Sequence, residues 1–296
     1  MLCSKCRHPA IIYQRYSGLH LCKAHFIADF ESKAKRAMRN HRWIKPKDRI
    51  AVALSGGEES SALLYFMKKI LGTRRDVSLL AISIDEGIKG YRDRRIAANI
   101  AESIGVELIT DSIDELFGKT IDEVVREKGD RFSCTFCKGL RDLVLNQIAN
   151  DHDITKLALG LTLDDEAKNV LVHIFRGDAE RLLKPADTLP RVVPLIRPFL
   201  YIPAREVALY AYFNMEGFEI RRCPYSHNTL ETDVHALLNK YNWRHPSTKY
   251  ALVNLGEHLV SYGVMPLTDA GICPDCGEPC HGEYQEWGML RELHHV

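Results

Sequence analysis

The length, composition and charge of the chain exclude several classes of protein. With 296 residues, 46% of them hydrophobic, it can form one large folded domain with small appendages, and it is not disordered. Its net charge of +1 means that any affinity for nucleic acid must come from local patches. No apolar run approaches the ~20 residues of a membrane span, and the N-terminus is no signal peptide. We therefore expect a cytoplasmic protein without membrane contact, whose nine cysteines stay reduced and serve metal or redox chemistry.

The chain opens with two pairs of metal-ligand residues. Cys3-x-x-Cys6 is followed by Cys22-x-x-His25, and each pair has the spacing of one knuckle of a tetrahedral zinc site. Between the pairs, we predict a short strand over residues 10–13. A segment of about 30 residues cannot bury a core of its own, so a zinc ion would stabilise it. The alternative is two unrelated pairs of cysteine and histidine residues.

A basic segment comes next. Residues 26–47 are predicted to form a helix and then a loop, with His41 and Trp43 among the basic side chains. A strip this basic suits the phosphate backbone of a nucleic acid, and the alternative is a solvated helix face. The basic residues are Lys33, Lys35, Arg36, Arg39, Arg42, Lys45 and Lys47.

A glycine turn between an apolar strand and a helix follows. Residues 49–54 are predicted to form a strand, residues 55–60 read Ser-Gly-Gly-Glu-Glu-Ser, and a helix continues from there. Backbone amides and the positive end of the helix dipole would converge on this turn, which favours a bound phosphate or pyrophosphate. Alternatively, Ser55 and Glu58 have the spacing of a capping box, and a carboxylate of the protein would partly fill the site.

Strands and helices alternate over the following residues. This alternation predicts an α/β fold with a doubly wound, mainly parallel sheet covered on both faces. Ligands of such sheets bind beyond the carboxyl ends of the strands, so the 55–60 turn, Asp85 and Asp164 would lie at that edge. The predicted strands are 77–84, 106–110 and 157–160, and the predicted helices are 94–104 and 164–175.

A second set of cysteines lies within and beyond this region. Cys134 and Cys137 form a Cys-x-x-Cys pair, and Cys223 follows far downstream. Three thiolates are one ligand short of a closed zinc or cluster site, and a cysteine pair also suits disulfide exchange. We expect the nearby basic residues, among them Arg141, to favour thiolates over thiols. The alternative is a buried pair and an unrelated cysteine.

Acidic residues open the predicted helix 164–175. The sequence is Leu163-Asp164-Asp165-Glu166-Ala167, directly after an apolar strand. The helix dipole alone favours acidic residues in a first turn, which is the structural explanation. The functional explanation is that Asp164 positions a magnesium ion or a substrate.

Taken together, these motifs resemble those of one family. The 55–60 turn resembles the PP-loop of ATP pyrophosphatases, and the order of all motifs is similar to that of the archaeal and eukaryotic cytosolic tRNA 2-thiolation enzymes. Residues 202–207 and 245–250 resemble the branch that acts on wobble uridine 34, and the branch that acts on uridine 54 is the alternative. The motifs, in order, are the N-terminal knuckles, the PP-loop, Ser83-Ile84-Asp85-Glu86-Gly87, Cys134-Thr135-Phe136-Cys137, Leu163-Asp164-Asp165-Glu166-Ala167, Cys223-Pro224-Tyr225 and Cys273-x-x-Cys276.

The resemblance implies an ATP-dependent tRNA sulfurtransferase. ATP and Mg²⁺ would adenylate O2 of a uridine, and sulfur would displace AMP to give 2-thiouridine. Cys134, Cys137 and Cys223 would hold a [4Fe–4S] cluster, with a cluster-free persulfide route as the competing chemistry, and Arg141 and Asp164 would assist. The partners would be tRNA, a second copy of the chain, and a sulfur donor that is either sulfide or a ubiquitin-like thiocarboxylate protein. The ATP ligands would be Ala53, Ser55, Gly56, Gly57, Ser60, Asp85 and Gly160.

The sequence departs from the family pattern in three places. Such loops usually read Ser-Gly-Gly-Lys-Asp-Ser, and here Glu58 replaces the lysine. Gly160-Leu161-Thr162 stands where relatives have Gly-His-Asn. In the C-terminal zinc module the second ligand pair is missing, and Cys280 and His281 are the substitutes we expect to join Cys273 and Cys276. These changes suggest, as an alternative function, a non-catalytic tRNA-binding paralogue.

The predicted organisation has five parts, with a PP-loop fold similar to adenine nucleotide alpha hydrolases between two zinc-ribbon-like modules. They are an N-terminal zinc module over 1–30, a basic helix and linker over 31–48, the PP-loop domain over 49–225, a helical extension over 226–265, and a C-terminal zinc module over 266–296.

Overall fold

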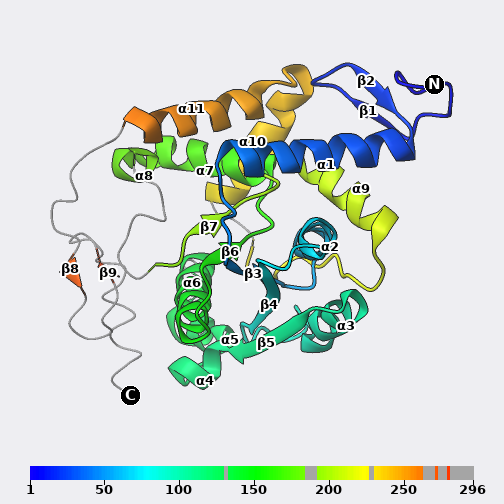
Figure 1. Ribbon diagram of the computed structural model, residues 1–296. Helices are drawn as coiled ribbons and strands as arrows, with labels where there is room; N and C mark the ends of the chain where they lie inside the picture. The colour runs from blue at the N-terminus through cyan, green and yellow to red at the C-terminus, as the bar shows by residue number, and fades with distance from the viewer. Residues whose placement is uncertain (130–132, 184–191, 227–229, 263–270, 273–278, 281–296) are drawn as a thin grey trace.

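The centre of the molecule is a five-stranded parallel sheet. The computed structural model describes residues 1–129, 133–183, 192–226, 230–262, 271–272 and 279–280. The strand order of the sheet is β5-β4-β3-β6-β7, so the chain winds outward in both directions from the neighbours β3 and β6 (Figure 1). This topology confirms the predicted doubly wound α/β fold. The strands are β3 (Arg49–Ala53), β4 (Ser78–Asp85), β5 (Glu107–Ser112), β6 (Lys156–Ala158) and β7 (Leu195–Ile196).

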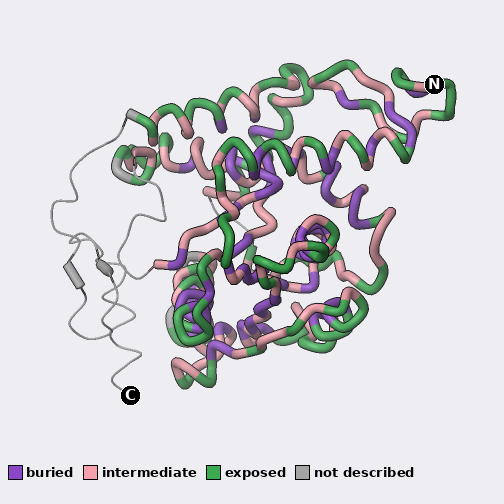
Figure 2. The backbone as a smooth tube through the Cα atoms, viewed as in Figure 1, coloured by how far each residue is buried: buried purple, intermediate pink, exposed green. Residues whose placement is uncertain are grey.

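Alternate side chains of the strands build two separate cores, one on each face of the sheet. Ile50 and Val52 of β3 are fully buried in one cluster, and Ala51 between them belongs to the other. Both faces are covered, which explains why the strands read as continuous apolar runs, and the buried residues gather around the sheet (Figure 2). Helices α2 (Glu58–Leu71) and α3 (Arg94–Ile104) cover the first face, and α4 (Ile113–Phe117), α5 (Ile121–Lys128) and α6 (Ser133–Asp151) cover the second.

A group of helices packs on the side of the sheet edge formed by β7 (Figure 1). Leu163 and Ala167 of α7 share a buried cluster with Val234, Leu238 and Val253. The last three residues belong to the segment that we expect to be a helical extension. The helices of this group are α7 (Leu163–Arg176), α8 (Ala179–Leu183), α10 (Leu230–Arg244) and α11 (Thr248–Tyr262), and α9 (Ala204–Asn214) packs against α2.

The N-terminal segment is joined to the core by one long helix. Strands β1 (Ile12–Gln14) and β2 (Leu19–Leu21) form an antiparallel hairpin, and α1 (Lys23–Asn40) follows at once. The ring of Phe30 stacks on the ring of Tyr210 with centroids 4.0 Å apart. The boundary that we expect between residues 30 and 31 therefore falls inside α1.

Two further observations complete the fold. Strands β8 (Gly271–Ile272) and β9 (Pro279–Cys280) form a short antiparallel pair near the C-terminus. Among the helices that the structure describes, none is both long and apolar enough to cross a bilayer.

Candidate active site and metal centre

The turn over residues 55–60, called the nucleotide loop below, lies between β3 and α2, at the point where the sheet reverses its winding. Gly56 has a φ of +82°, and a Cβ there would come within 3.0 Å of Ile96 Cγ2. A Cβ on Gly160, which follows β6, would lie 3.0 Å from the backbone of Glu59. Both positions favour glycine, Gly56 because of its positive φ and the Ile96 side chain, and Gly160 because the backbone of α2 approaches it closely. The loop, β6 and the start of α3 are thus packed together at the carboxyl edge of the sheet.

Hydroxyl groups, and no carboxylate, hold the nucleotide loop. Ser60 Oγ accepts a hydrogen bond from Ser55 N at 3.1 Å and donates to Gly57 O at 3.1 Å. Helix α2 begins at Glu58 with Gly57 as its N-cap, and no side chain caps it. The alternative of a capping box between Ser55 and Glu58 is therefore wrong, because Glu58 is the first residue of the helix and not the third.

Two acidic side chains stand at the start of α2. Glu58 and Glu59 are both partly buried. Burial raises the pKa of Glu59 from its ordinary 4.5 to about 7, and the negative charges of Glu58 and Asp165 add to the rise while Arg92 opposes it. At neutral pH the loop therefore carries less negative charge than its sequence indicates.

Asp85 ends β4 at the same edge of the sheet. Its Oδ1 accepts a hydrogen bond from Gly87 N at 2.8 Å, and its Oδ2 accepts one from Arg94 Nε at 2.5 Å. These bonds fix the turn between β4 and α3. The role of Asp85 as an ATP ligand stays a prediction.

Glu86, directly after Asp85, and Arg92 form an ion pair that the sequence did not predict. Glu86 is a carboxylate with only 2% of its surface exposed. It accepts a hydrogen bond from Arg92 Nη1 at 2.5 Å, and Arg141 Nη1 lies 3.7 Å away. The only signal in the sequence was a charged residue directly after a buried strand.

The fold brings the second set of cysteines together. Cys134 and Cys137 lie on the first turns of α6, and Cys134 Sγ lies 3.6 Å from the carbonyl oxygen of Tyr225. Cys137 and Cys223 pack against the same hydrophobic cluster. The fold thus brings three cysteines from distant parts of the sequence to one region, and their role as ligands of one cluster stays a prediction.

Burial dominates the pKa values of two thiols of this site. It raises the pKa of Cys137 to about 12, although the charge of Arg141 lowers it, and it also raises the pKa of Cys134. Arg141 thus acts on Cys137 in the direction that we expect, towards the thiolate, but burial outweighs it. Arg221 instead donates a hydrogen bond to Gly90 O at 3.1 Å and pairs with Glu219.

Asp164 makes contacts that link the PP-loop domain to the last helices. Its Oδ1 lies 2.5 Å from the buried Lys249 Nζ, and its Oδ2 accepts a hydrogen bond from Ala204 N at 2.9 Å. The neighbouring Asp165 forms a capping box with Thr162. Thr162, which stands where relatives have the asparagine of Gly-His-Asn, is therefore the N-cap of α7. In this structure Asp164 therefore has protein partners, and its role in the reaction stays a prediction.

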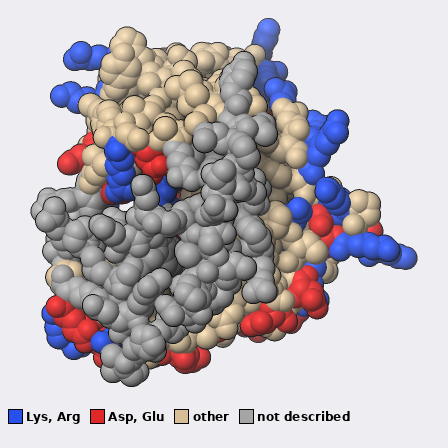
Figure 3. Space-filling model, turned by 90° about the vertical axis from the view of Figure 1, so that its left-hand side faces the viewer, with Lys and Arg blue, Asp and Glu red and all other residues tan. Residues whose placement is uncertain are grey.

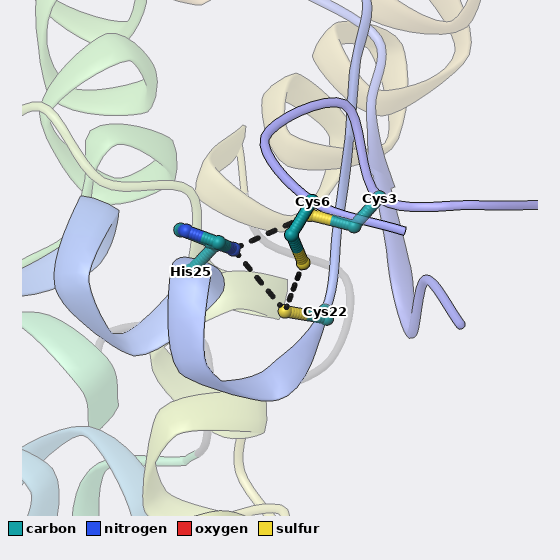
Figure 4. A group of neighbouring side chains, drawn as sticks. All are labelled: Cys3, Cys6, Cys22 and His25. Carbon is teal, nitrogen blue, oxygen red and sulfur yellow. Dashed lines mark hydrogen bonds between the residues drawn. The ribbon is translucent and has the colours of Figure 1, made fainter. Parts of the chain in front are cut away.

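The N-terminal ligands form one compact group (Figure 4). The ligand atoms of Cys3, Cys6, Cys22 and His25 all lie within 4.8 Å of one another. Cys6 Sγ and Cys22 Sγ are 3.7 Å apart, close to the ~3.8 Å that two thiolates have around tetrahedral zinc. Burial raises the pKa of Cys3, but hydrogen bonds from backbone amides outweigh it and bring the pKa down to about 6. The group fits one metal ion.

The basic strip of α1 is only partly available to a partner. Lys33 Nζ lies 2.5 Å from Asp29 Oδ2 and 3.7 Å from the fully buried Glu206, so this lysine belongs to an internal network. The nearest charge to Lys35 Nζ is Glu31, 3.6 Å away. The following basic residues are exposed and have no salt bridge within the described part of the chain: Arg36, Arg39, Arg42, Lys45 and Lys47.

The predicted C-terminal metal site falls largely outside the described residues. Cys273, Cys276 and His281 lie outside the described residues, and Cys280 is described only by its place in β9.

The fold and the nucleotide loop define the class of the protein. A serine- and glycine-rich loop at the switch point of a parallel sheet is the arrangement of a PP-loop nucleotide-binding protein, and residues 27–220 match the PP-loop domain family. Residues 2–27 match the N-terminal LIM domain of the 2-thiouridine synthetase TtuA. The chain belongs to the tRNA 2-thiolation family of PP-loop proteins.

Individual relatives match over nearly the whole chain. The tRNA 2-thiolation protein NcsA of Haloferax volcanii is 30% identical over 96% of both chains. The cytoplasmic tRNA 2-thiolation protein 1 of Anopheles gambiae is 32% identical over 98% of this chain and 89% of its own. The solved structure of the U34-tRNA thiolase NcsA from Methanococcus maripaludis with its [4Fe–4S] cluster has a TM-score of 0.81 and 29% identity, covering 92% of each chain.

Proposed function

We propose that this chain is an ATP-dependent tRNA-uridine 2-sulfurtransferase that acts on wobble uridine 34. The observation that carries the proposal is the convergence of a PP-loop with Cys134, Cys137 and Cys223, which the fold collects from distant parts of the sequence. The relatives named above as tRNA 2-thiolation proteins and as a U34-tRNA thiolase support this substrate.

The proposed reaction has two displacements. O2 of the uridine attacks the α-phosphorus of ATP and pyrophosphate leaves. A sulfide sulfur then attacks C2 of the uridine and AMP leaves, giving 2-thiouridine. Gly56, Gly57 and Ser60 would bind the pyrophosphate through their backbone amides, which needs the loop geometry and not a particular side chain at position 58.

The three cysteines would hold a [4Fe–4S] cluster, as the Methanococcus maripaludis thiolase does with its own ligands. When bound, such a cluster offers one iron without a cysteine ligand, at which sulfide can bind. Arg141 would balance negative charge beside Cys137, which packs against a buried apolar cluster.

The proposal extends to partners and location. tRNA is the substrate, and the exposed basic residues of α1 and the following loop are suited to its backbone. We also propose a sulfur donor, either sulfide or a ubiquitin-like thiocarboxylate protein, a homodimer, and the cytoplasm as the place of action. Relatives named as cytoplasmic support the last point.

The first test is the nucleotide chemistry. Anaerobically purified and iron-reconstituted protein, supplied with sulfide, should convert ATP to AMP and pyrophosphate only when tRNA is added. The Cys223→Ala variant should still release pyrophosphate but neither free AMP nor 2-thiouridine, because cysteine removal leaves the nucleotide loop intact and only sulfur displaces AMP. If ATP yields no AMP with any tRNA, the proposed reaction is wrong.

A second candidate function is that of a non-catalytic tRNA-binding paralogue. The observation in its favour is the pair Glu58 and Glu59 at a site that should bind phosphate. This candidate predicts tight tRNA binding without AMP formation. Thiolation of uridine 54 is the remaining alternative, and tRNA transcripts that lack one of the two uridines distinguish it.

A further inference from the structure

A short loop after β4 lies between the nucleotide loop and the cysteine site. The start of α3 packs against Gly56, Glu219 N donates a hydrogen bond to Gly56 O at 3.0 Å, and Arg221 binds Gly90 O at 3.1 Å. Tyr91 packs against the same cluster as Cys137 and Cys223. Residues 88–92 therefore contact the segment that carries Cys223, and α3, which follows them, contacts the nucleotide loop.

The side chain of Arg92 is held firmly in this loop. It donates to Glu86 at 2.5 Å and to Tyr91 Oη at 3.0 Å, and its guanidinium lies 4.6 Å from the centre of the Tyr91 ring. A carboxylate as buried as Glu86 is stable only with such partners, so Arg92 and Arg141 are fixed around it. With 28% of the side chain exposed, Arg92 can still contact a ligand.

The charge of Arg92 acts on both sites. Burial raises the pKa values of Glu59 and Cys137, and Arg92 lowers both. Geometry places Arg92 at the same edge of the sheet as the nucleotide loop: Leu54 N, just before the loop, donates a hydrogen bond to Ile82 O of β4 at 2.7 Å, and β4 ends at Asp85, directly before Glu86. Because Glu86 holds Arg92 and Ile96 of the following helix contacts Gly56, the guanidinium lies on the side of the sheet where the loop would bind a phosphate.

We propose that Glu86 is a positioning residue that holds Arg92 and Arg141 between the nucleotide loop and the cysteine site, and that Arg92 gives bound ATP the positive charge that position 58 lacks. The proposal rests on the ATP binding of the proposed function. It explains how a PP-loop with glutamate in place of lysine still binds a polyphosphate.

The test is the affinity for magnesium-ATP, measured by calorimetry on the full-length protein. Arg92→Gln should weaken ATP binding about tenfold, the loss expected for one charge-assisted hydrogen bond, and should weaken adenosine binding much less. Arg92→Lys should restore most of the affinity because it restores the charge. Arg95→Gln is the matched control, since Arg95 is 85% exposed and pairs only with Asp93, and it should bind ATP as the native protein does.

A double variant tests whether Arg92 compensates for the missing lysine at position 58 or only stabilises the fold. With Glu58→Lys in place, ATP should bind more tightly, and adding Arg92→Gln should then cost less than it costs in the native protein. Glu86→Gln should weaken ATP binding in the same direction as Arg92→Gln, with an unchanged far-ultraviolet circular dichroism spectrum. These are binding measurements, so they stand apart from the AMP assay that tests the proposed function.

Three results would overturn the proposal. They are ATP affinity that Arg92→Gln leaves unchanged, an equal loss of ATP and adenosine affinity, and a native chain that binds no ATP until Glu58 is replaced by lysine.

Discussion

At the scale of single residues, different residues of the nucleotide loop determine its backbone shape and its charge. Gly56 and Gly160 keep the shape of the loop because a Cβ at either position would meet a neighbour at 3.0 Å. Glu58 and Glu59 change its charge without changing that shape. Glu59 responds by keeping its proton up to about pH 7.

This protonation predicts a pH dependence of stability. The pKa of Glu59 in the folded protein, about 7, lies above its ordinary value of 4.5, so ionisation is costly in the folded state. The stabilisation is fully present below pH 4.5 and is lost as the pH rises through 7, by at most about 3 kcal/mol. Glu59→Gln should remove this part of the pH dependence in chemical denaturation.

Glu58 provides a control for this prediction, because its negative charge helps to raise the pKa of Glu59. Glu58→Gln removes a neighbouring negative charge and should move the pH at which stability falls to a lower value. If the native protein and Glu59→Gln lose stability identically between pH 4.5 and 8, Glu59 is ionised throughout and the buried-acid explanation is wrong.

At the scale of elements, helix starts position most of the chemistry. Helix α2 begins at the nucleotide loop, α6 carries Cys134 and Cys137 at its start, and α7 and α1 carry Asp164 and His25 in their first turns. These residues could be recognised in the sequence by their type, and each lies where a strand or loop is followed by a helix.

The cysteine site gives an element-scale prediction. Anaerobic protein should be brown, and changing Cys134, Cys137 or Cys223 to alanine should each abolish the iron–sulfur absorbance, because three ligands leave no redundancy. Cys22→Ser should keep the absorbance and serve as the control. Colourless, iron-free native protein after reconstitution would exclude the cluster and leave the persulfide route.

The zinc site at the N-terminus gives a second prediction at the scale of elements. Cys22→Ser should lose about one zinc ion per chain, because a structural site needs all four ligands. Faster amide exchange should be confined to residues before α1, since Phe26 and Phe30 anchor that helix in the main core. Zinc content is measured by mass spectrometry, and a content equal to that of the native protein would refute the assignment.

The elements that could be predicted from sequence were those with strong local patterns. The strand before the nucleotide loop, α3 and the zinc knuckles follow from apolar runs, helical period and ligand spacing. Long-range contacts could not be predicted, because nothing near Glu86 or Lys249 in the sequence indicates their distant partners Arg141 and Asp164. The capping-box error arose from a spacing that fits two structures equally well.

At the scale of the whole molecule, charge is distributed unevenly. Lysine and arginine side chains stand along the edges of the face shown in Figure 3, and acidic groups lie lower on the same face. With a net charge of +1, binding of a polyanion must depend on such local groups. The unpaired basic residues at the end of α1 and after it are the candidates.

The corresponding prediction concerns tRNA binding. Reversing Arg36 and Arg39 to glutamate should weaken tRNA binding and reduce its salt dependence, because fewer counterions are released. Filter binding across a range of salt concentrations measures the slope, and the thermal unfolding midpoint should stay unchanged since both side chains are exposed. An unchanged slope would mean that these residues form only a solvated helix face.

One measurement tests the central claim most directly. Iron-reconstituted native protein is incubated with ATP, magnesium, sulfide and tRNA, and the tRNA fragments are then analysed by mass spectrometry. We predict one sulfur atom in place of oxygen on the base of uridine 34, absent without ATP and absent in Cys223→Ala. Iron-loaded protein that binds tRNA but leaves every uridine unmodified would contradict the account, and sulfur at uridine 54 alone would contradict the assigned position.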